Sequence, residues 1–390
     1  MENSLLGKIV DTRKISLINI CLFILIGLLL CFGQILRISL FQQLINIYAH
    51  EFLMILLITF NWKKSLKIIF HQYSLITLGF ILASFIVNLD SFTTKENIFA
   101  TLYTLRLIIW FIWIWLSSRL FKSFTASQKQ TIKYFGLVFA LSILTSSILQ
   151  YFFYPTLVNF SSFGWDPHTG RIFGVMFDTG AMATVLILIS IFIYQLKNIS
   201  LIWLISLITI IATFSRSSYI TLVIVLISIK NIRKNIIFQL LFALIFVIFV
   251  FTSFQKNDVA KNIFRTFSII SRIDDQKESL MLIKKNWLTG VGIGRIRYVR
   301  SLGVSEKTNI FDEYAHHLNA FASSWLTVWT WLGTIAMVWV GYLILIIYQK
   351  SNNIQKLTLL SVFIMSIFDN ILFQSLVFGV MGCFFIIESD

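Results

Sequence analysis

Four arginines in this 390-residue chain have neighbours that suit phosphate binding. Arg171 lies in the run GRIFG, Arg216 in FSRSS, Arg272 begins RIDD, and Arg295 follows the glycines of GVGIG. A guanidinium offers paired N–H donors that match phosphate oxygens, and it is costly to desolvate without such a partner. Each could instead be a helix-end arginine whose charged head reaches water. The four are therefore candidate ligands of a phosphate or diphosphate.

The glycine run Gly290, Gly292 and Gly294 could allow a backbone to approach a phosphate or a sugar closely. It is a poor match to a dinucleotide fingerprint, which needs a preceding strand, a following helix and fixed glycine spacing. A plain turn is the alternative interpretation.

A histidine pair follows the glycine run by about twenty residues. Glu313 and His317 are four residues apart, so on a helix their side chains could meet, and His316 lies beside them. A carboxylate next to an imidazole is typical of a general base that could deprotonate a sugar hydroxyl. A solvated helix start is the structural alternative. A metal site built from these residues and His168 is disfavoured because no diagnostic ligand spacing is present.

Composition indicates the elements that must position these residues. The chain is 57% hydrophobic and 13% charged, with a mean hydropathy of +0.84. It contains two prolines and long apolar runs without alternation, which favours an all-α membrane bundle over a barrel. Twelve segments are long enough to be predicted as transmembrane helices: 16–36, 38–60, 68–89, 98–118, 132–153, 176–195, 199–213, 217–230, 236–253, 318–348, 354–369 and 371–387.

Charge predicts the orientation of this single membrane domain, residues 1–390. Lys and Arg are concentrated at alternate short loops, and the depleted side holds Arg37, Lys95, Arg171 and Arg216. Because basic flanks stay in the cytoplasm, both termini are expected there. The long segment 254–317, between the predicted helices nine and ten, is then extracytoplasmic. Its start, Asp258 to Ile270, has the apolar spacing of an amphipathic helix.

The positive net charge of +15 follows largely from these helix flanks, which disfavours nucleic-acid binding. The three cysteines lie within apolar segments, so neither a disulfide framework nor a zinc site is expected. Two charges fall inside predicted helices, Glu51 in the second and Arg106 in the fourth. We expect them to pair, because each would be expensive alone in hydrocarbon. The pair could be structural, or part of a proton or substrate path.

Together these motifs resemble the O-antigen ligase and Wzy-type polymerase family of bacterial envelope glycan enzymes. The resemblance is carried by Arg171 to Leu186, by TFSRSSY at 213–219, by Arg272 with the later WLTGVGIG run, and by AHHLN at 315–319. Trp287 replaces a proline that the family often has there, and the distance from the histidines to Gly333 is longer than usual. Either His316 or His317 could match the family histidine.

The resemblance implies a twelve-helix inner-membrane protein with an extracytoplasmic active site and metal-independent, inverting glycosyl transfer. It places Arg171, Arg216 and Arg272 on the diphosphate of an undecaprenyl-linked donor, and a histidine near the acceptor hydroxyl. No cofactor is expected. The expected partners are the lipid-linked donor, an acceptor glycan lipid, membrane lipids and a chain-length regulator protein.

Three functions remain open at this point. The first is a polymerase of O-antigen or capsule repeats, the second a ligase that moves the glycan onto lipid A-core. The third is a lipid-linked glycan transporter or flippase. Transporters often show helices broken by Gly or Pro in both halves, whereas Pro155 and Pro167 lie in one predicted loop.

Overall fold

The computed structural model describes residues 2–40, 45–159, 168–196, 200–229, 266–300 and 319–384. In these ranges four helices are long and apolar enough to cross a membrane, namely Ser16–Leu36, Thr94–Lys122, Ala126–Phe153 and Ser324–Lys350. A bent pair, Trp62–Ile69 with Gln72–Val87, makes a fifth candidate span. The expectation of an apolar helical membrane protein is therefore confirmed in its coarse form. The predicted ninth helix, 236–253, lies outside the described residues, so the count of twelve stays a prediction.

The helices follow the apolar runs of the sequence closely. The long ones are α1 (Glu2–Phe32), α5 (Thr94–Lys122), α6 (Ala126–Phe153) and α14 (Ser324–Lys350). Shorter helices occupy most of the remaining predicted segments: α2 (Ala49–Phe60), α3 (Trp62–Ile69), α4 (Gln72–Val87), α7 (Thr179–Gln195), α8 (Ser200–Ile211), α9 (Arg216–Ser228), α15 (Asn353–Phe368) and α16 (Ser375–Phe384). The short 3-10 helices η1 (Gly33–Leu36) and η3 (Gly174–Met176) adjoin α1 and α7.

One predicted helix is wrong in its first half. Residues expected at the start of the 38–60 span form an antiparallel hairpin of β1 (Arg37–Leu40) and β2 (Ile45–Tyr48), with Arg37 opposite Tyr48. The two strands satisfy each other's backbone hydrogen bonds, so this stretch does not have to be helical to pair its N–H and C=O groups. Polar Gln42, Gln43 and Asn46 interrupt this stretch of sequence and separate it from the continuous apolar run of α2. Glu51 consequently lies in the first turn of α2, rather than near the centre of a helix.

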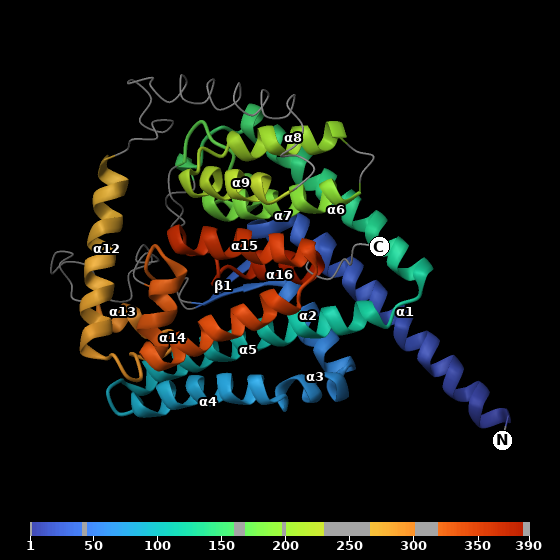
Figure 1. Ribbon diagram of the computed structural model, residues 1–390, viewed down its shortest axis with the longest axis horizontal. Helices are drawn as coiled ribbons and strands as arrows, with labels where there is room; N and C mark the ends of the chain where they lie inside the picture. Colours follow the sequence, from blue (N-terminus) through green and yellow to red (C-terminus); the bar gives the residue numbers. More distant parts are fainter. Residues whose placement is uncertain are drawn as a thin grey trace.

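The α7 helix forms the centre of the bundle. Every residue from Thr179 to Ile193 is buried, which is expected for a helix that is apolar on all faces. Figure 1 shows α15 and α16 on one side of α7, with α8 and α9 on the other. The α4, α5 and α14 helices run alongside one another below α15 and α16 in the same view.

The α12 helix (Thr266–Lys285) differs from the rest because it lies across one end of the bundle (Figure 1). The N-terminal end of α1 projects from the opposite end. The predicted amphipathic helix at 258–270 falls mostly outside the described residues, and the helix that is described continues to Lys285. Through α12, part of the 254–317 segment meets the ends of α15 and α14.

Candidate functional site

Asp369, directly after α15, lies beside two of the four candidate phosphate ligands, Arg272 and Arg216. The Arg272 Nη2 lies 2.7 Å from Asp369 Oδ1, and its Nη1 donates to the Phe368 carbonyl. The Ser217 hydroxyl donates a hydrogen bond to Asp369 Oδ2. One carboxylate therefore joins α12 and α9 at the end of α15.

Arg216, the first residue of α9, belongs to the same group. Burial and the nearby positive charge of Arg272 lower the pKa of the Arg216 guanidinium, whereas the negative charge of Asp369 raises it. An arginine remains protonated under any physiological condition, so the net result is two cations around one carboxylate. The structure thus brings Arg216 and Arg272 together, although they are 56 positions apart in sequence.

Two helix N-termini add positive potential at this point. Ser217 lies in the first turn of α9, and Gly180 lies in the first turn of α7. A Cβ built on Gly180 would be 3.3 Å from Asp369 Oδ2, so the α7 backbone approaches the carboxylate closely. The Asp178 side chain caps α7 by accepting from the Ala181 N–H at 2.6 Å. Helix N-termini favour anions, and here both surround the position that Asp369 occupies.

Arg171 is held beside the turn that leads to Arg216. The Ile172 N–H donates to the Ala212 carbonyl at 3.0 Å, so the Arg171 segment runs next to the end of α8. The Gln150 side chain accepts from Phe173 and Gly174, each at 3.1 Å, and fixes the same segment to α6. The Arg171 residue is buried, and its role as a diphosphate ligand stays a prediction.

Arg295 has different surroundings from the other three arginines. Its side chain is fully buried, between the rings of Phe85 and Phe92 at 4.6 and 4.9 Å. It donates to the Phe85 carbonyl and to the Asn97 side chain. These contacts attach the end of the glycine run to α4 and α5, so the guanidinium of Arg295 has a structural role. They do not include Asp369, so nothing in them supports the predicted diphosphate role.

The three glycines allow close packing, Gly290 and Gly292 against α14 and Gly294 against α5. The Val291 and Gly292 N–H groups donate to the Thr330 and Trp331 carbonyls at 2.9 and 3.0 Å, where Gly333 breaks the helix with a φ of 82°. A Cβ on Gly290 would lie 2.3 Å from the Trp331 carbonyl oxygen, and one on Gly294 3.2 Å from the Tyr103 Cβ. The predicted close approach therefore exists, but its partners in the structure are protein backbone and side chains instead of a ligand.

The predicted general base and its carboxylate, His316, His317 and Glu313, lie outside the described residues. The ends of the 301–318 segment are described, and both are attached to α12. Arg300, which is 8% exposed, lies 2.6 Å from Asp275 and 2.8 Å from Glu278. Asp275 also accepts from the Ala322 N–H at 3.2 Å. The two ends of this segment therefore meet on α12, close to Arg272.

The second of these ends is also joined to α15. The Ser324 hydroxyl donates to the Asp369 carbonyl at 3.0 Å, and it accepts from the Leu372 N–H at 3.1 Å. The start of α14, the end of α15 and the centre of α12 thus form one connected polar region. We call Arg216, Arg272, Ser217 and Asp369 the Asp369 cluster.

The Glu51–Arg106 pair expected from the sequence is confirmed, with Arg106 Nε 2.7 Å from Glu51 Oε1. The same carboxylate oxygen accepts from Trp110 at 2.9 Å and from Ser375 at 2.6 Å. His50 is within hydrogen-bond distance of Ser375 Oγ at 2.8 Å. A buried polar network therefore joins α2, α5 and α16.

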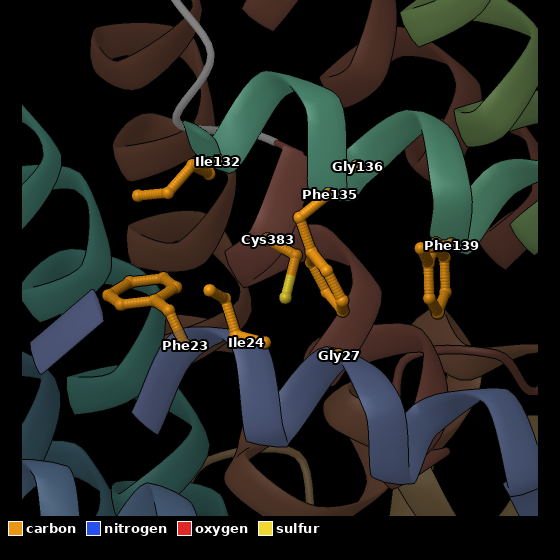
Figure 2. Close-up of a pocket in the computed structure, with 8 residues that line it drawn as sticks. All are labelled: Phe23, Ile24, Gly27, Ile132, Phe135, Gly136, Phe139 and Cys383. Carbon is orange, nitrogen blue, oxygen red and sulfur yellow. The ribbon is translucent and has the colours of Figure 1, made fainter. Parts of the chain in front are cut away.

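An apolar crevice between α1, α6 and α16 has no such chemistry (Figure 2). It is lined by Phe23, Ile24, Gly27, Ile132, Phe135, Gly136, Phe139 and Cys383. This lining suits hydrocarbon and offers no charged partner to a phosphate. Within the described ranges no group of three or more His, Cys, Asp or Glu side chains could hold a metal ion. Because the histidine pair lies elsewhere, metal independence stays a prediction.

Asp369 was not among the candidates drawn from the sequence, although a signal exists. It stands with Asn370 between the apolar runs of α15 and α16. A charged residue that separates two membrane helices usually needs no explanation beyond the loop itself. Only its position opposite α9 and α12 shows that it joins two arginines.

Comparison with known proteins identifies one matching family. Residues 201–327 match the family model described as O-Antigen ligase. The match contains Arg216, Arg272, the glycine run and the histidine pair, and it confirms the resemblance to the O-antigen ligase and Wzy-type family. No curated protein and no solved structure matches the chain.

Proposed function

We propose that this membrane protein transfers a glycan from an undecaprenyl-diphosphate carrier to a hydroxyl group of an acceptor glycan. The observation that carries the proposal is the convergence of Arg216 and Arg272 on Asp369, at the N-termini of α7 and α9. This position concentrates positive charge and hydrogen-bond donors where a diphosphate would develop charge. The family match over the same residues supports the substrate class.

The chemistry needs no external energy source, because a sugar attached to a diphosphate is already activated. The acceptor oxygen forms a bond to the anomeric carbon while the bond from that carbon to the phosphate oxygen breaks. The electron pair goes to the leaving diphosphate, where the guanidinium groups of Arg216 and Arg272 stabilise it. The hydroxyl proton goes to a general base. The products are the elongated glycan and undecaprenyl diphosphate.

We assign the base to His317 or His316, assisted by Glu313. Their place in the sequence, a few residues before Ala322, supports this assignment. The neighbouring Ala322 is bound to Asp275 on the helix that carries Arg272.

Asp369 receives a positioning role in this proposal. Without substrate, the carboxylate offsets one of the two guanidinium charges and fixes the fork of Arg272. Because a carboxylate and a phosphate compete for the same donors, binding of the donor would require Arg272 to exchange part of this contact. Ser217 would then be free to donate to a phosphate oxygen.

Polymerisation of lipid-linked repeats is our first choice, and we place the protein in the bacterial inner membrane with both termini cytoplasmic. A chain-length regulator is the partner that such a polymerase would need. Ligation of the glycan onto lipid A-core is the second candidate, and the description of the matching family favours it.

The test is incubation of purified, reconstituted protein with defined lipid-linked repeats, with and without lipid A-core. A ladder of products on the carrier lipid would identify a polymerase, and transfer to the core a ligase. Arg216→Ala should abolish either product. If Arg216→Ala retains near-normal turnover, the assignment of the Asp369 cluster is wrong. If it alters only the distribution of lipid across the bilayer, the protein is a transporter.

A further inference from the structure

A second pair of arginines lies away from the Asp369 cluster. Arg106 on α5 and Arg297 on α13 (Ile296–Val299) both lie near Tyr103. Arg106 is three residues from Tyr103 on the same helix, and a Cβ built on Gly294, just before α13, would lie 3.2 Å from the Tyr103 Cβ. The hydrogen bonds from Arg295, directly before α13, to the Phe85 carbonyl and the Asn97 side chain place the start of α13 beside the end of the α4–α5 hairpin. The two arginines come from segments nearly 200 residues apart in sequence.

Arg106 uses only part of its donor capacity. Its Nε binds Glu51, and its guanidinium lies over the rings of Tyr48 and Trp110 at 5.3 and 4.9 Å. The terminal Nη2 is buried and has no hydrogen-bond partner among the described residues. A buried guanidinium N–H without an acceptor is costly. Arg106 therefore has at least one donor available to a further group.

Glu51 is already engaged and cannot neutralise a second arginine. Its Oε1 accepts from Arg106, Trp110 and Ser375, and its Oε2 accepts from the Tyr48 N–H at 3.1 Å. Three donors on one carboxylate oxygen leave it little capacity for another. Any additional positive charge nearby is therefore left without this counter-ion.

Arg297 is that additional charge. The residue is 6% exposed, and its Nε is buried without a hydrogen-bond partner within the described ranges. The hydroxyls of Tyr298 and Tyr103 lie within electrostatic range of the Arg297 guanidinium, and both are neutral at physiological pH. Tyr103 is within Coulombic range of both Arg297 and Arg106. A buried guanidinium with such neighbours needs an anion.

A third arginine lies near Tyr48. Arg37 lies opposite Tyr48 in the hairpin, and its charge and that of Arg106 both act on the Tyr48 hydroxyl. Arg106 thus lies near Tyr48 together with Arg37, and near Tyr103 together with Arg297. Aromatic rings next to arginines also suit the faces of a sugar attached to the anion.

We propose that Arg106 and Arg297 form a second anion site, which binds a phosphate group of the acceptor lipid. The inference rests on the proposed function, in which two lipid substrates that both carry phosphate must be bound at once. The Asp369 cluster holds the diphosphate of the donor. The Arg106–Arg297 site holds the phosphate of the acceptor, with Tyr48 and Tyr103 beside it.

Binding of farnesyl diphosphate, a short prenyl diphosphate, tests the proposal without requiring transfer. The full-length protein in phosphatidylcholine nanodiscs should bind two molecules per chain in a calorimetric titration. Arg272→Ala and Arg297→Gln should each leave one, and the double variant none. Arg297→Lys should weaken its site about 10-fold, because a point charge replaces the paired donors. Two unchanged sites in Arg297→Gln would overturn the inference.

A matched control removes a positive charge elsewhere. Lys284 is an exposed residue of α12, and Lys284→Gln should retain two sites. If it loses one as well, net charge and not this pair explains binding, and the inference fails. A parallel titration in phosphatidylglycerol nanodiscs distinguishes a bulk lipid headgroup from a substrate phosphate. Displacement of farnesyl diphosphate from the Arg297 site by phosphatidylglycerol would overturn the assignment to an acceptor.

Transfer kinetics separate this inference from the proposed function. With lipid-linked repeats, Arg297→Gln should raise the KM for the acceptor about 10-fold and leave the KM for the donor unchanged. An equal rise of both values would contradict two separate sites. If the wild-type protein shows two-site binding but no transfer with any acceptor, the proposed function fails while the second anion site stands.

Discussion

The Arg300 guanidinium lies 2.6 Å from the Asp275 carboxylate, one helical turn along α12 from Arg272. This contact and the bond from the Ala322 N–H to Asp275 hold both ends of the 301–318 segment on α12. The helix that supplies a proposed phosphate ligand therefore also anchors the segment that contains the predicted base. The positions of the side chains in the Asp369 cluster should consequently depend on Asp275 and Arg300, even if neither residue contacts the substrate.

Asp275→Ala is expected to lower the transfer rate and to destabilise the protein by about 1–3 kcal/mol, because the mostly buried Arg300 side chain loses one of its two carboxylate partners, Asp275 and Glu278. Purified variants can be compared by thermal unfolding and by turnover with lipid-linked repeats. The control is Lys277→Ala, which breaks an exposed pair with Asp274 on the same helix. It should change stability by less than about 0.5 kcal/mol. Equal effects of the two substitutions would contradict the anchoring role.

Reversal of this pair offers a sharper comparison. Asp275→Arg and Arg300→Asp should each reduce turnover, because each places like charges together on α12. The double variant should recover part of the activity, since opposite charges face one another again. No recovery in the double variant, with wild-type folding, would show that the contact between the two side chains does not carry the effect.

Arg272 and Asp369 should behave as one unit. Arg272→Ala and Asp369→Ala are each expected to lower kcat at least 100-fold, comparable to the loss of a transition-state donor. The double variant should be scarcely worse than either single variant, because both remove the same arrangement. Arg272→Lys should retain part of the rate, since it keeps the charge and loses the fork. Additive losses in the double variant would indicate independent roles.

Gly333 and Gly341 on α14 predict opposite results for one substitution. Gly333→Ala requires a left-handed φ of 82° and places a Cβ 2.3 Å from the Leu288 carbonyl oxygen, so the protein should be destabilised by several kcal/mol. Gly341→Ala meets no atom within 4 Å and should be neutral or slightly stabilising in a helix. Thermal unfolding of the two variants checks this. A tolerated Gly333→Ala would mean that the glycine run and α14 can separate.

The Glu51–Arg106 pair should be more sensitive to loss of one partner than of both. Glu51→Gln leaves Arg106 without its counter-ion and should cost about 3–5 kcal/mol of stability. The double variant Glu51→Gln with Arg106→Gln is expected to be milder, because no unpaired charge remains. Unfolding in detergent compares the three proteins. A double variant that is worse than Glu51→Gln would argue against a direct pair.

Sequence reasoning was most successful where a local property decides the outcome. Apolar runs located the ends of α4 to α9 and α14 to α16 to within six residues, because a helix in hydrocarbon must satisfy its own backbone. The Glu51–Arg106 pair could also be predicted, since two charges in apolar surroundings are expensive apart. The hairpin at Arg37–Tyr48 was missed because its backbone pairing depends on a partner strand.

The sequence by itself determined that this protein is a helical membrane chain with arginines between its helices. Hydropathy and charge are properties of each residue, so they can be read along the chain without knowledge of its folding. Only the tertiary structure decided which arginines share a neighbour. Arg295 is hydrogen-bonded to the Phe85 carbonyl and the Asn97 side chain, whereas Arg216 and Arg272 both lie beside Asp369. The distance between two residues in the sequence does not show which helix ends will lie together in the fold. The packing of the helices therefore decides which carboxylate each arginine contacts.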